Sequence, residues 1–148
     1  MIKEDRQIKE GSHVFPIRVY YEDTDAGGIV YYANYLRFAE RARSEMFRCL
    51  GIESNQMFKD WGILFTVKKC FIDFIKPARL DDLLLVKTQL TKIGGASVSV
   101  IQKVTMDRSD IVCMDLKLAC MSLEGKPARM PVSIRKLLNN SQKLLEIK

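Results

Sequence analysis

The sequence predicts an α+β domain in which an antiparallel sheet wraps around one long central helix. Two observations lead to this prediction. Apolar residues between Ala33 and Gly51 recur with the period of a helix, whereas five other segments have the composition and alternation of strands. The links between the last four of these segments are short. Short links favour antiparallel neighbours, because a parallel crossover needs about a dozen residues or more.

The helix is predicted from residue 33 to residue 50. Charged residues, including Glu40 and Arg43, fill one side of it. Gly51 is well placed to end the helix, since glycine readily adopts the left-handed conformation found just after helices. The apolar residues lie three or four positions apart and would share the opposite face: Tyr35, Phe38, Ala39, Ala42, Met46, Cys49 and Leu50.

The strands are predicted at residues 15–22, 63–74, 83–90, 97–104 and 111–123. The last four would form an antiparallel meander, and residues 132–145 are expected to form a terminal helix. In this interpretation residues 12–148 make a single domain, which is long enough to bury a core. Residues 1–11 form a polar arm that we expect to be disordered.

Composition limits the classes of function. Of the 148 residues, 47% are hydrophobic, and no apolar run approaches the roughly 20 residues that span a bilayer. The polar first residues do not resemble a secretory signal, so we expect a cytoplasmic protein. The net charge is +6, but the basic residues are dispersed and no aromatic-interleaved basic motif appears. We therefore expect no nucleic-acid partner.

Cysteine and histidine usage narrows the chemistry further. The four cysteines lie in apolar or alternating segments without the close pairing of metal sites, so we interpret them as reduced core thiols. The single histidine, His13, precedes the first predicted strand in an arm expected to be mobile. A Ser/His/Asp or Cys/His pair would have to use this one residue, which excludes most histidine-based mechanisms. Neither a metal nor an organic cofactor is expected.

The turn before the helix is the chemically distinctive segment. It carries three acids, Glu22, Asp23 and Asp25, followed by Gly27 and Gly28. Helix starts have unpaired amide donors and a partial positive charge, which can stabilise an oxyanion. A carboxylate delivered beside such donors suggests acyl chemistry.

The run YYEDTDAGGIVYYANYLRFAERARSEM (residues 20–46) resembles the hotdog-fold acyl-CoA thioesterases of the YbgC and 4-hydroxybenzoyl-CoA thioesterase group. The later segments PARLDD (77–82) and GKPARMP (125–131) extend the resemblance over nearly the whole chain. The resemblance implies a hotdog fold and hydrolysis of an acyl-CoA to a free acid and CoA. It also implies a homo-oligomer, a dimer or a dimer of dimers, whose sheets pair edge to edge.

The resemblance assigns residues to roles. Asp25 would be the catalytic carboxylate, acting as nucleophile on the thioester or as base toward water. Backbone amides in the region of Gly28 and Tyr32 would hold the thioester oxygen. YbgC-like proteins commonly have histidine where this chain has Tyr32, so an imidazole proton relay is lost. The remaining assignments are the pocket residues Tyr21, Tyr31 and Tyr32, and the CoA-binding residues Lys92, Ser97, Lys126 and Arg129.

Other interpretations stay open at this point. Asp23 is expected to be a turn former, and each basic residue near the CoA is by itself an ordinary surface charge. The alternative to an enzyme is a hotdog module that binds acyl-CoA, an acyl carrier protein or a cell-envelope partner with little turnover. A hotdog dehydratase is disfavoured, because such enzymes use an active-site histidine and His13 lies ahead of the motif.

Overall fold

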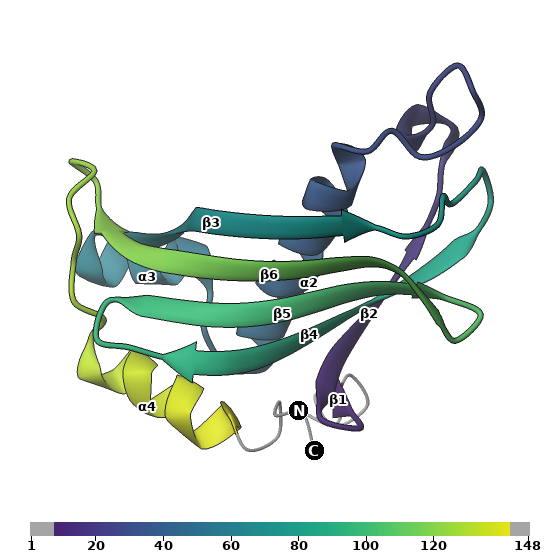
Figure 1. Ribbon diagram of the computed structural model, residues 1–148. Coiled ribbons are helices and arrows are strands. Elements are labelled where there is room, and N and C mark those ends of the chain that lie inside the picture. Colours follow the sequence, from purple (N-terminus) through teal and green to yellow (C-terminus); the bar gives the residue numbers. More distant parts are fainter. Residues whose placement is uncertain (1–7, 143–148) are drawn as a thin grey trace.

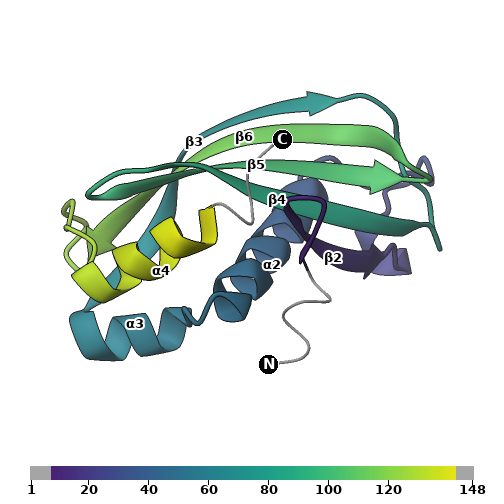
Figure 2. The ribbon, with the colours of Figure 1, turned by 90° about the horizontal axis from the view of Figure 1, so that it is seen from below.

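The computed structural model describes residues 8–142, and it shows one six-stranded antiparallel sheet with helices on one face (Figures 1 and 2). The order of strands across the sheet is β1-β2-β4-β5-β6-β3. This arrangement confirms the predicted α+β class with a sheet around a helix. The strands are β1 (Ile8–Lys9), β2 (Ser12–Arg18), β3 (Ile63–Phe74), β4 (Leu83–Ile93), β5 (Ser97–Met106) and β6 (Ser109–Ser122).

The central helix α2 (Asn34–Cys49) lies across the inner face of the sheet, as predicted. Phe38, Ala39, Ala42 and Met46 are at most 1% exposed, and the two alanines let the helix approach the sheet closely. Gly51 ends this segment with a φ of +88°. The shorter helices α3 (Ser54–Trp61) and α4 (Val132–Gln142) cover the same face. Helix α4 agrees with the predicted terminal helix from residue 132 to residue 142, the last described residue. Residues 143–145 of that prediction lie outside the described residues.

The strand order differs from the predicted four-strand meander. Only β4, β5 and β6 follow one another across the sheet, while β3 pairs with β6 at the far edge and β4 pairs with β2. The link at residues 75–82 is short but not a hairpin. Its eight residues can span about 26 Å, whereas three strand spacings are only about 14 Å. Link length alone was therefore a poor guide to which strands are neighbours.

The N-terminal part also differs from expectation. Residues 1–7 of the arm expected to be disordered lie outside the described residues, but Ile8–Lys9 form β1 and pair with β2. The first long strand begins at Ser12 rather than at residue 15 and ends at Arg18. It ends early because Tyr21–Asp23 form the short 3-10 helix η1. The Asp23 carboxylate accepts a hydrogen bond from the Tyr20 amide at 2.8 Å, which stabilises this turn.

The prediction that His13 lies in a mobile arm is wrong. His13 is in β2, opposite Thr88 of β4, and its side chain is 0% exposed. Burial lowers the pKa of His13 from its ordinary value of 6.5, and the nearby Glu45 carboxylate partly opposes this shift. The histidine is therefore neutral and part of the interior.

Arg43 is also buried, although the helix pattern placed it on the polar side. Its guanidinium donates to the side-chain oxygen of Gln102 at 2.9 Å. The Gln102 amide nitrogen in turn donates to the carbonyl of Ala39 and to the hydroxyl of Thr88, both at 2.9 Å. This network joins α2 to β4 and β5 through buried polar groups, so it fixes the helix over one place on the sheet.

Replacing Gln102 by leucine should lower the free energy of unfolding by about 3 kcal/mol, because it leaves a buried guanidinium without its acceptor. Urea titration followed by circular dichroism measures the change. Gln56→Leu is the matched control, since Gln56 is exposed on α3. Equal unfolding midpoints for the two variants would contradict a stabilising role for the network.

Stability should fall as the pH decreases through about 6.5. The folded state keeps His13 neutral, whereas the unfolded chain binds a proton there below its ordinary pKa of 6.5. The stabilisation is therefore present above pH 6.5 and is lost toward the lowered pKa of the folded state. Urea midpoints at about pH 7.5 and about pH 5.5 should differ in the natural chain and differ less in His13→Gln. An equal pH dependence in both chains would rule out His13 as the cause.

Candidate functional site

The acid-rich turn is held by a second segment, residues 78–82. The Val19 amide donates to the Asp82 carbonyl and the Val30 amide donates to the Ala78 carbonyl, both at 2.9 Å. Ile29 and Arg79 also form an isolated antiparallel bridge. Both ends of the turn are thus fixed to the link between β3 and β4, which places the turn directly before α2 (Figure 1).

Asp23 has a structural role in this turn. Its carboxylate caps the Tyr20 amide, and its carbonyl accepts from the Tyr31 amide and from the Asn34 side chain, both at 2.9 Å. These bonds connect η1 to the first residue of α2. They support the expectation that Asp23 forms the turn.

Asp25 has different surroundings. Its Oδ1 accepts from the Gly27 amide at 2.8 Å and from the Ile29 amide at 3.4 Å, and the residue is exposed. Within the described residues, no protein group donates to Oδ2. One oxygen therefore fixes the direction of the carboxylate, and the other is accessible to a ligand or a water molecule.

The backbone amides near the helix start divide into two groups. The Gly28 amide donates to the Asp25 carbonyl at 3.0 Å, with Gly28 at a φ of +81°. This bond occupies the donor that the resemblance assigned to the oxyanion. The amides of Tyr32 and Ala33 donate to no acceptor in the part of the chain that the structure describes. Tyr32 and Ala33, the residue that immediately precedes α2, therefore have open amides.

Aromatic side chains form a wall beside the helix start. The rings of Tyr31 and Tyr32 lie 5.0 Å apart, and Tyr32 meets Phe74 edge to face at 6.1 Å. Phe74 and Tyr35 also line an apolar cavity of about 270 Å³. Tyr21, by contrast, is 84% exposed in η1, and the structure does not place its ring against these residues. The sequence analysis did not predict Phe74 as a residue of this wall. Phe74 lies at the end of β3, far from the acid-rich motif in the sequence.

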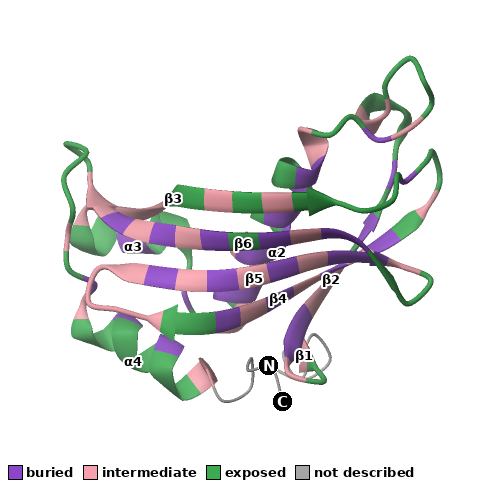
Figure 3. Ribbon diagram, viewed as in Figure 1, coloured by how far each residue is buried: buried purple, intermediate pink, exposed green. Residues whose placement is uncertain are grey.

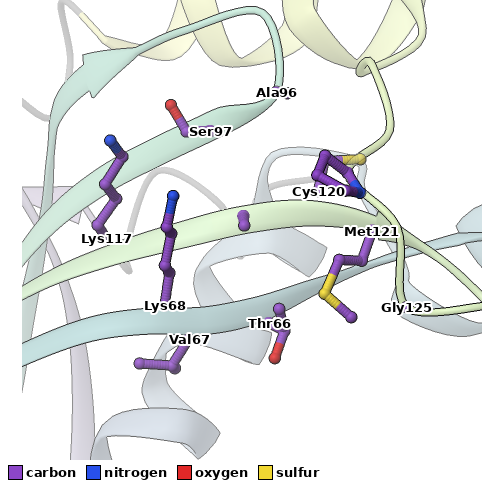
Figure 4. Close-up of a pocket in the computed structure, with 11 residues that line it drawn as sticks. Thr66, Val67, Lys68, Ala96, Ser97, Lys117, Cys120, Met121 and Gly125 are labelled. Carbon is purple, nitrogen blue, oxygen red and sulfur yellow. The ribbon is translucent and has the colours of Figure 1, made fainter.

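The residues assigned to CoA lie at the opposite end of the sheet. Ser97 lines a pocket of about 580 Å³ near the turn between β4 and β5 (Figure 4). Arg129 lies over this turn, since a Cβ atom on Gly95 would come within 3.5 Å of its Nη2. Lys126 is exposed in the loop after β6, and Lys92 is exposed on β4. Lys92 and Lys126 are not among the residues that line the pocket.

Two lysines that sequence reasoning missed also line this pocket. Lys68 comes from β3 and Lys117 from β6, and Figure 4 shows their side chains extending in the same direction. No motif marks them, because they belong to different strands and meet only through sheet pairing. From Thr66, in this pocket, to Phe74, in the aromatic wall, β3 extends about 26 Å. Within one chain, the pocket that contains Ser97 and the aromatic wall beside the helix start therefore lie far apart.

Thiol and metal chemistry find little support among the described residues. Residues 8–142 contain no cluster of three His, Cys, Asp or Glu side chains that could hold a metal. The four cysteines are free thiols. Burial raises the pKa values of Cys70, Cys113 and Cys120, which leaves these thiols protonated near neutral pH. In the same range no helix is long and apolar enough to cross a membrane.

Comparison with known proteins identifies the family. The thioesterase superfamily model matches residues 27–113, from the acid-rich turn to β6. The chain belongs to the thioesterase superfamily. An acyl-CoA thioesterase YbgC from Haemophilus influenzae is 40% identical over 122 residues, covering 82% of this chain and 90% of the relative. An acyl-CoA thioester hydrolase YbgC from Escherichia coli is 38% identical over 122 residues, covering 81% of this chain and 90% of the relative.

A solved structure agrees with this family. A probable thioesterase from Bartonella henselae superposes with a TM-score of 0.78 at 36% identity, covering 81% of this chain and 99% of the other. These similarities confirm the predicted resemblance, the hotdog fold and the predicted class of enzyme, a thioester hydrolase.

Asp23→Ala should lower the free energy of unfolding by about 1 kcal/mol, because it removes the acceptor for the Tyr20 amide. Urea unfolding measures this loss. Glu22→Ala is the control, since the neighbouring Glu22 is exposed and forms no ion pair with a described residue. If both variants unfold at the same urea concentration, the Asp23 bonds do not stabilise the turn.

Proposed function

We propose that the protein hydrolyses acyl-CoA thioesters to a free acid and CoA, with Asp25 as the reacting carboxylate. The observation that carries the proposal is the geometry of the turn. Asp25 presents an Oδ2 without a protein donor in the turn that leads into α2, and the Tyr32 and Ala33 amides at the end of this turn are open. Membership of the thioesterase superfamily and the activity named for the YbgC relatives support the same reaction.

Two routes use this geometry. In the first, the Asp25 carboxylate attacks the thioester carbonyl, the C–S bond breaks, CoA leaves as a thiol after protonation, and water hydrolyses the resulting anhydride. In the second, Asp25 accepts a proton from a water molecule that attacks the carbonyl directly. In both routes negative charge develops on the carbonyl oxygen, where the Tyr32 and Ala33 amides and the positive end of α2 would stabilise it.

The aromatic wall gives the acyl group a place near the same amides. Tyr31, Tyr32 and Phe74 lie where the acyl portion would meet the carbonyl site. Burial raises the pKa of Tyr35, and the Ala78 amide donates to its hydroxyl oxygen at 3.1 Å. Tyr35 is therefore protonated and neutral near neutral pH. Tyr32 contributes a backbone amide and an apolar ring where YbgC-like relatives commonly have imidazole.

A second copy of the chain would complete the site. β3 is an edge strand, and Val67, Phe71 and Phe74 on it are 44%, 73% and 50% exposed. Long exposed edges with apolar side chains tend to pair with another strand. If two β3 strands pair antiparallel about a two-fold axis, the Thr66 end of one meets the Phe74 end of the other. The CoA-binding end of one chain would then lie beside the Asp25 turn of its partner.

A cytoplasmic location and an acidic carrier protein as a further acyl donor remain part of the proposal. The free thiols suit a reducing compartment. The net charge of +6 suits an acidic partner. A module that binds acyl-CoA or such a carrier with little turnover is the rival interpretation, and it would need the same pocket without the reacting carboxylate.

Asp25→Asn should lower kcat by roughly 10²–10⁴-fold, the loss of about 3 to 5 kcal/mol expected for a main catalytic group. The assay follows thiol release from short-chain, long-chain and aromatic acyl-CoAs. The substitution keeps the size of the side chain and an oxygen that can accept from Gly27, so the unfolding midpoint should change little.

Two results would contradict the proposal. Full activity of Asp25→Asn would remove the carboxylate from the mechanism. Tight binding of a non-hydrolysable acyl-CoA analogue, with no turnover of any thioester by the natural chain, would favour the rival binding module.

A further inference from the structure

A small cavity lies between α2, the start of α3 and the strands β3 and β6. Both helices cover the same face of the sheet (Figure 2). The cavity has a volume of about 130 Å³, below the roughly 300–1,000 Å³ of sites that hold drug-sized ligands. It shares Val67 with the pocket that contains Ser97, and it shares no residue with the cavity beside Phe74. It is therefore a separate feature that suits only a small ligand.

Arg43 brings a buried positive charge to this cavity. The residue is 9% exposed and lines the cavity. A guanidinium can donate from each of its nitrogens, but the one hydrogen bond from Arg43 to a described residue is that from Nη1 to Gln102. Arg43 also forms no ion pair within residues 8–142, where the two ion pairs are Arg48–Glu45 and Lys103–Asp110. A buried cation without a paired anion is costly, because water no longer solvates its charge.

Two serine hydroxyls line the same cavity. Ser44 follows Arg43 on α2, and Ser54 is the first residue of α3. Neither hydroxyl forms a hydrogen bond with a described residue, and the Ser54 amide has no acceptor in that part of the chain. Hydroxyl and amide donors beside a guanidinium are the groups that bind an oxyanion. The polar side of the cavity therefore favours a negatively charged ligand.

The other side of the cavity is apolar. The rings of Phe47 and Phe65 stack with their centroids 5.3 Å apart. Val67 pairs with Leu118 beside a β-bulge, where the register of β3 on β6 shifts between Val67 and Lys69. Leu118 is one of the buried residues that alternate along β6 (Figure 3). A small ligand with one anionic end and a short apolar body fits these two sides, and a short-chain carboxylate has this chemistry.

Glu40 is the one acidic residue that lines the cavity. It is exposed on α2 and lies outside ion-pair distance of Arg43. Burial lowers the pKa of Arg43 from its ordinary value, and the Glu40 carboxylate opposes this shift. Arg43 remains protonated at neutral pH, since a guanidinium does not lose its proton in proteins. Glu40 would repel an anion bound at Arg43, so its removal should strengthen binding.

We propose that this cavity binds a short-chain organic acid. The guanidinium of Arg43 and the hydroxyls of Ser44 and Ser54 hold the carboxylate, and the stacked rings of Phe47 and Phe65 cover the apolar body. This site does not involve Asp25, so the inference goes beyond the proposed function and does not depend on it. A bound acid would join α2 to α3 and stabilise the folded chain, because it binds the folded state alone.

A nitrogen-15 NMR titration of the full chain tests the proposal. Butyrate is the probe, and butyramide has nearly the same shape without the charge. Butyrate should shift the Nε–H signal of Arg43 and the amide signals of Ser44 and Ser54, with a Kd on the order of 1 mM. Butyramide should leave these signals in place. Equal shifts with both compounds would overturn the carboxylate assignment. At equal ionic strength, phosphate or chloride binding as tightly as butyrate would overturn the role of the apolar side.

Two variants locate the bound acid. Ser44→Ala should weaken butyrate binding about tenfold, because it removes one hydrogen bond to a charged group. Glu40→Gln should tighten binding about fivefold, because it removes a nearby negative charge. Glu124→Gln is the matched control, since it makes the same charge change at an exposed position after β6 and outside the cavity. Neither Ser44 nor Glu40 belongs to the buried network of Arg43 and Gln102, so both variants should unfold at the natural urea midpoint.

Two results would overturn the location of the site. The first is an unchanged butyrate affinity in both Ser44→Ala and Glu40→Gln. The second is a changed affinity in Asp25→Asn with none in Glu40→Gln, which would place the acid at the turn before α2. Because binding is measured without any thioester, a loss of turnover in Asp25→Asn concerns the proposed function alone.

Discussion

The backbone hydrogen bonds between residues 19–30 and residues 78–82 are the constraint on which the candidate site depends. They join the turn before α2 to the link between β3 and β4, at Val19–Asp82 and at Val30–Ala78. The turn would otherwise be an exposed loop of acids and glycines with many conformations. Fixed at both ends, it holds the Asp25 carboxylate in the segment that leads to the open amides of Tyr32 and Ala33. The PARLDD segment is therefore part of the site architecture although none of its residues is assigned a chemical role.

The two aspartates of the turn show how one residue type takes different roles through its partners. Both are short acids in the turn before α2, and the carboxylates of both accept backbone hydrogen bonds. Asp23 also uses its carbonyl to hold Tyr31 and Asn34, so its bonds are directed into the fold. The Asp25 carbonyl accepts only from Gly28 within the same turn, and its carboxylate accepts only through Oδ1, which leaves Oδ2 without a donor among the described residues. The difference lies in the local hydrogen bonds and not in the chemical nature of the group.

The two parts of the proposed site lie toward opposite ends of the sheet, and the exposed edge strand β3 runs between them. The aromatic wall at Phe74 and the lysine pocket at Thr66 lie on the same strand, β3. A strand is too extended to bring its own ends together, but a two-fold axis across its edge reverses one copy relative to the other. Pairing through this exposed edge would therefore form the expected oligomer and bring the two halves of the proposed site together.

The sequence by itself determined the fold class, the long helix, most strand positions and the family, because these depend on periodicity and on a contiguous motif. Through the resemblance it also predicted different roles for Asp25 and Asp23. Only the tertiary structure decided the strand order, the burial of His13 and Arg43, the engagement of the Gly28 amide and the placement of Lys68 and Lys117 in one pocket. Each of these depends on contacts between residues far apart in the chain. Alternation and link length describe a segment and its neighbours, whereas sheet register and a β-bulge determine which distant side chains meet.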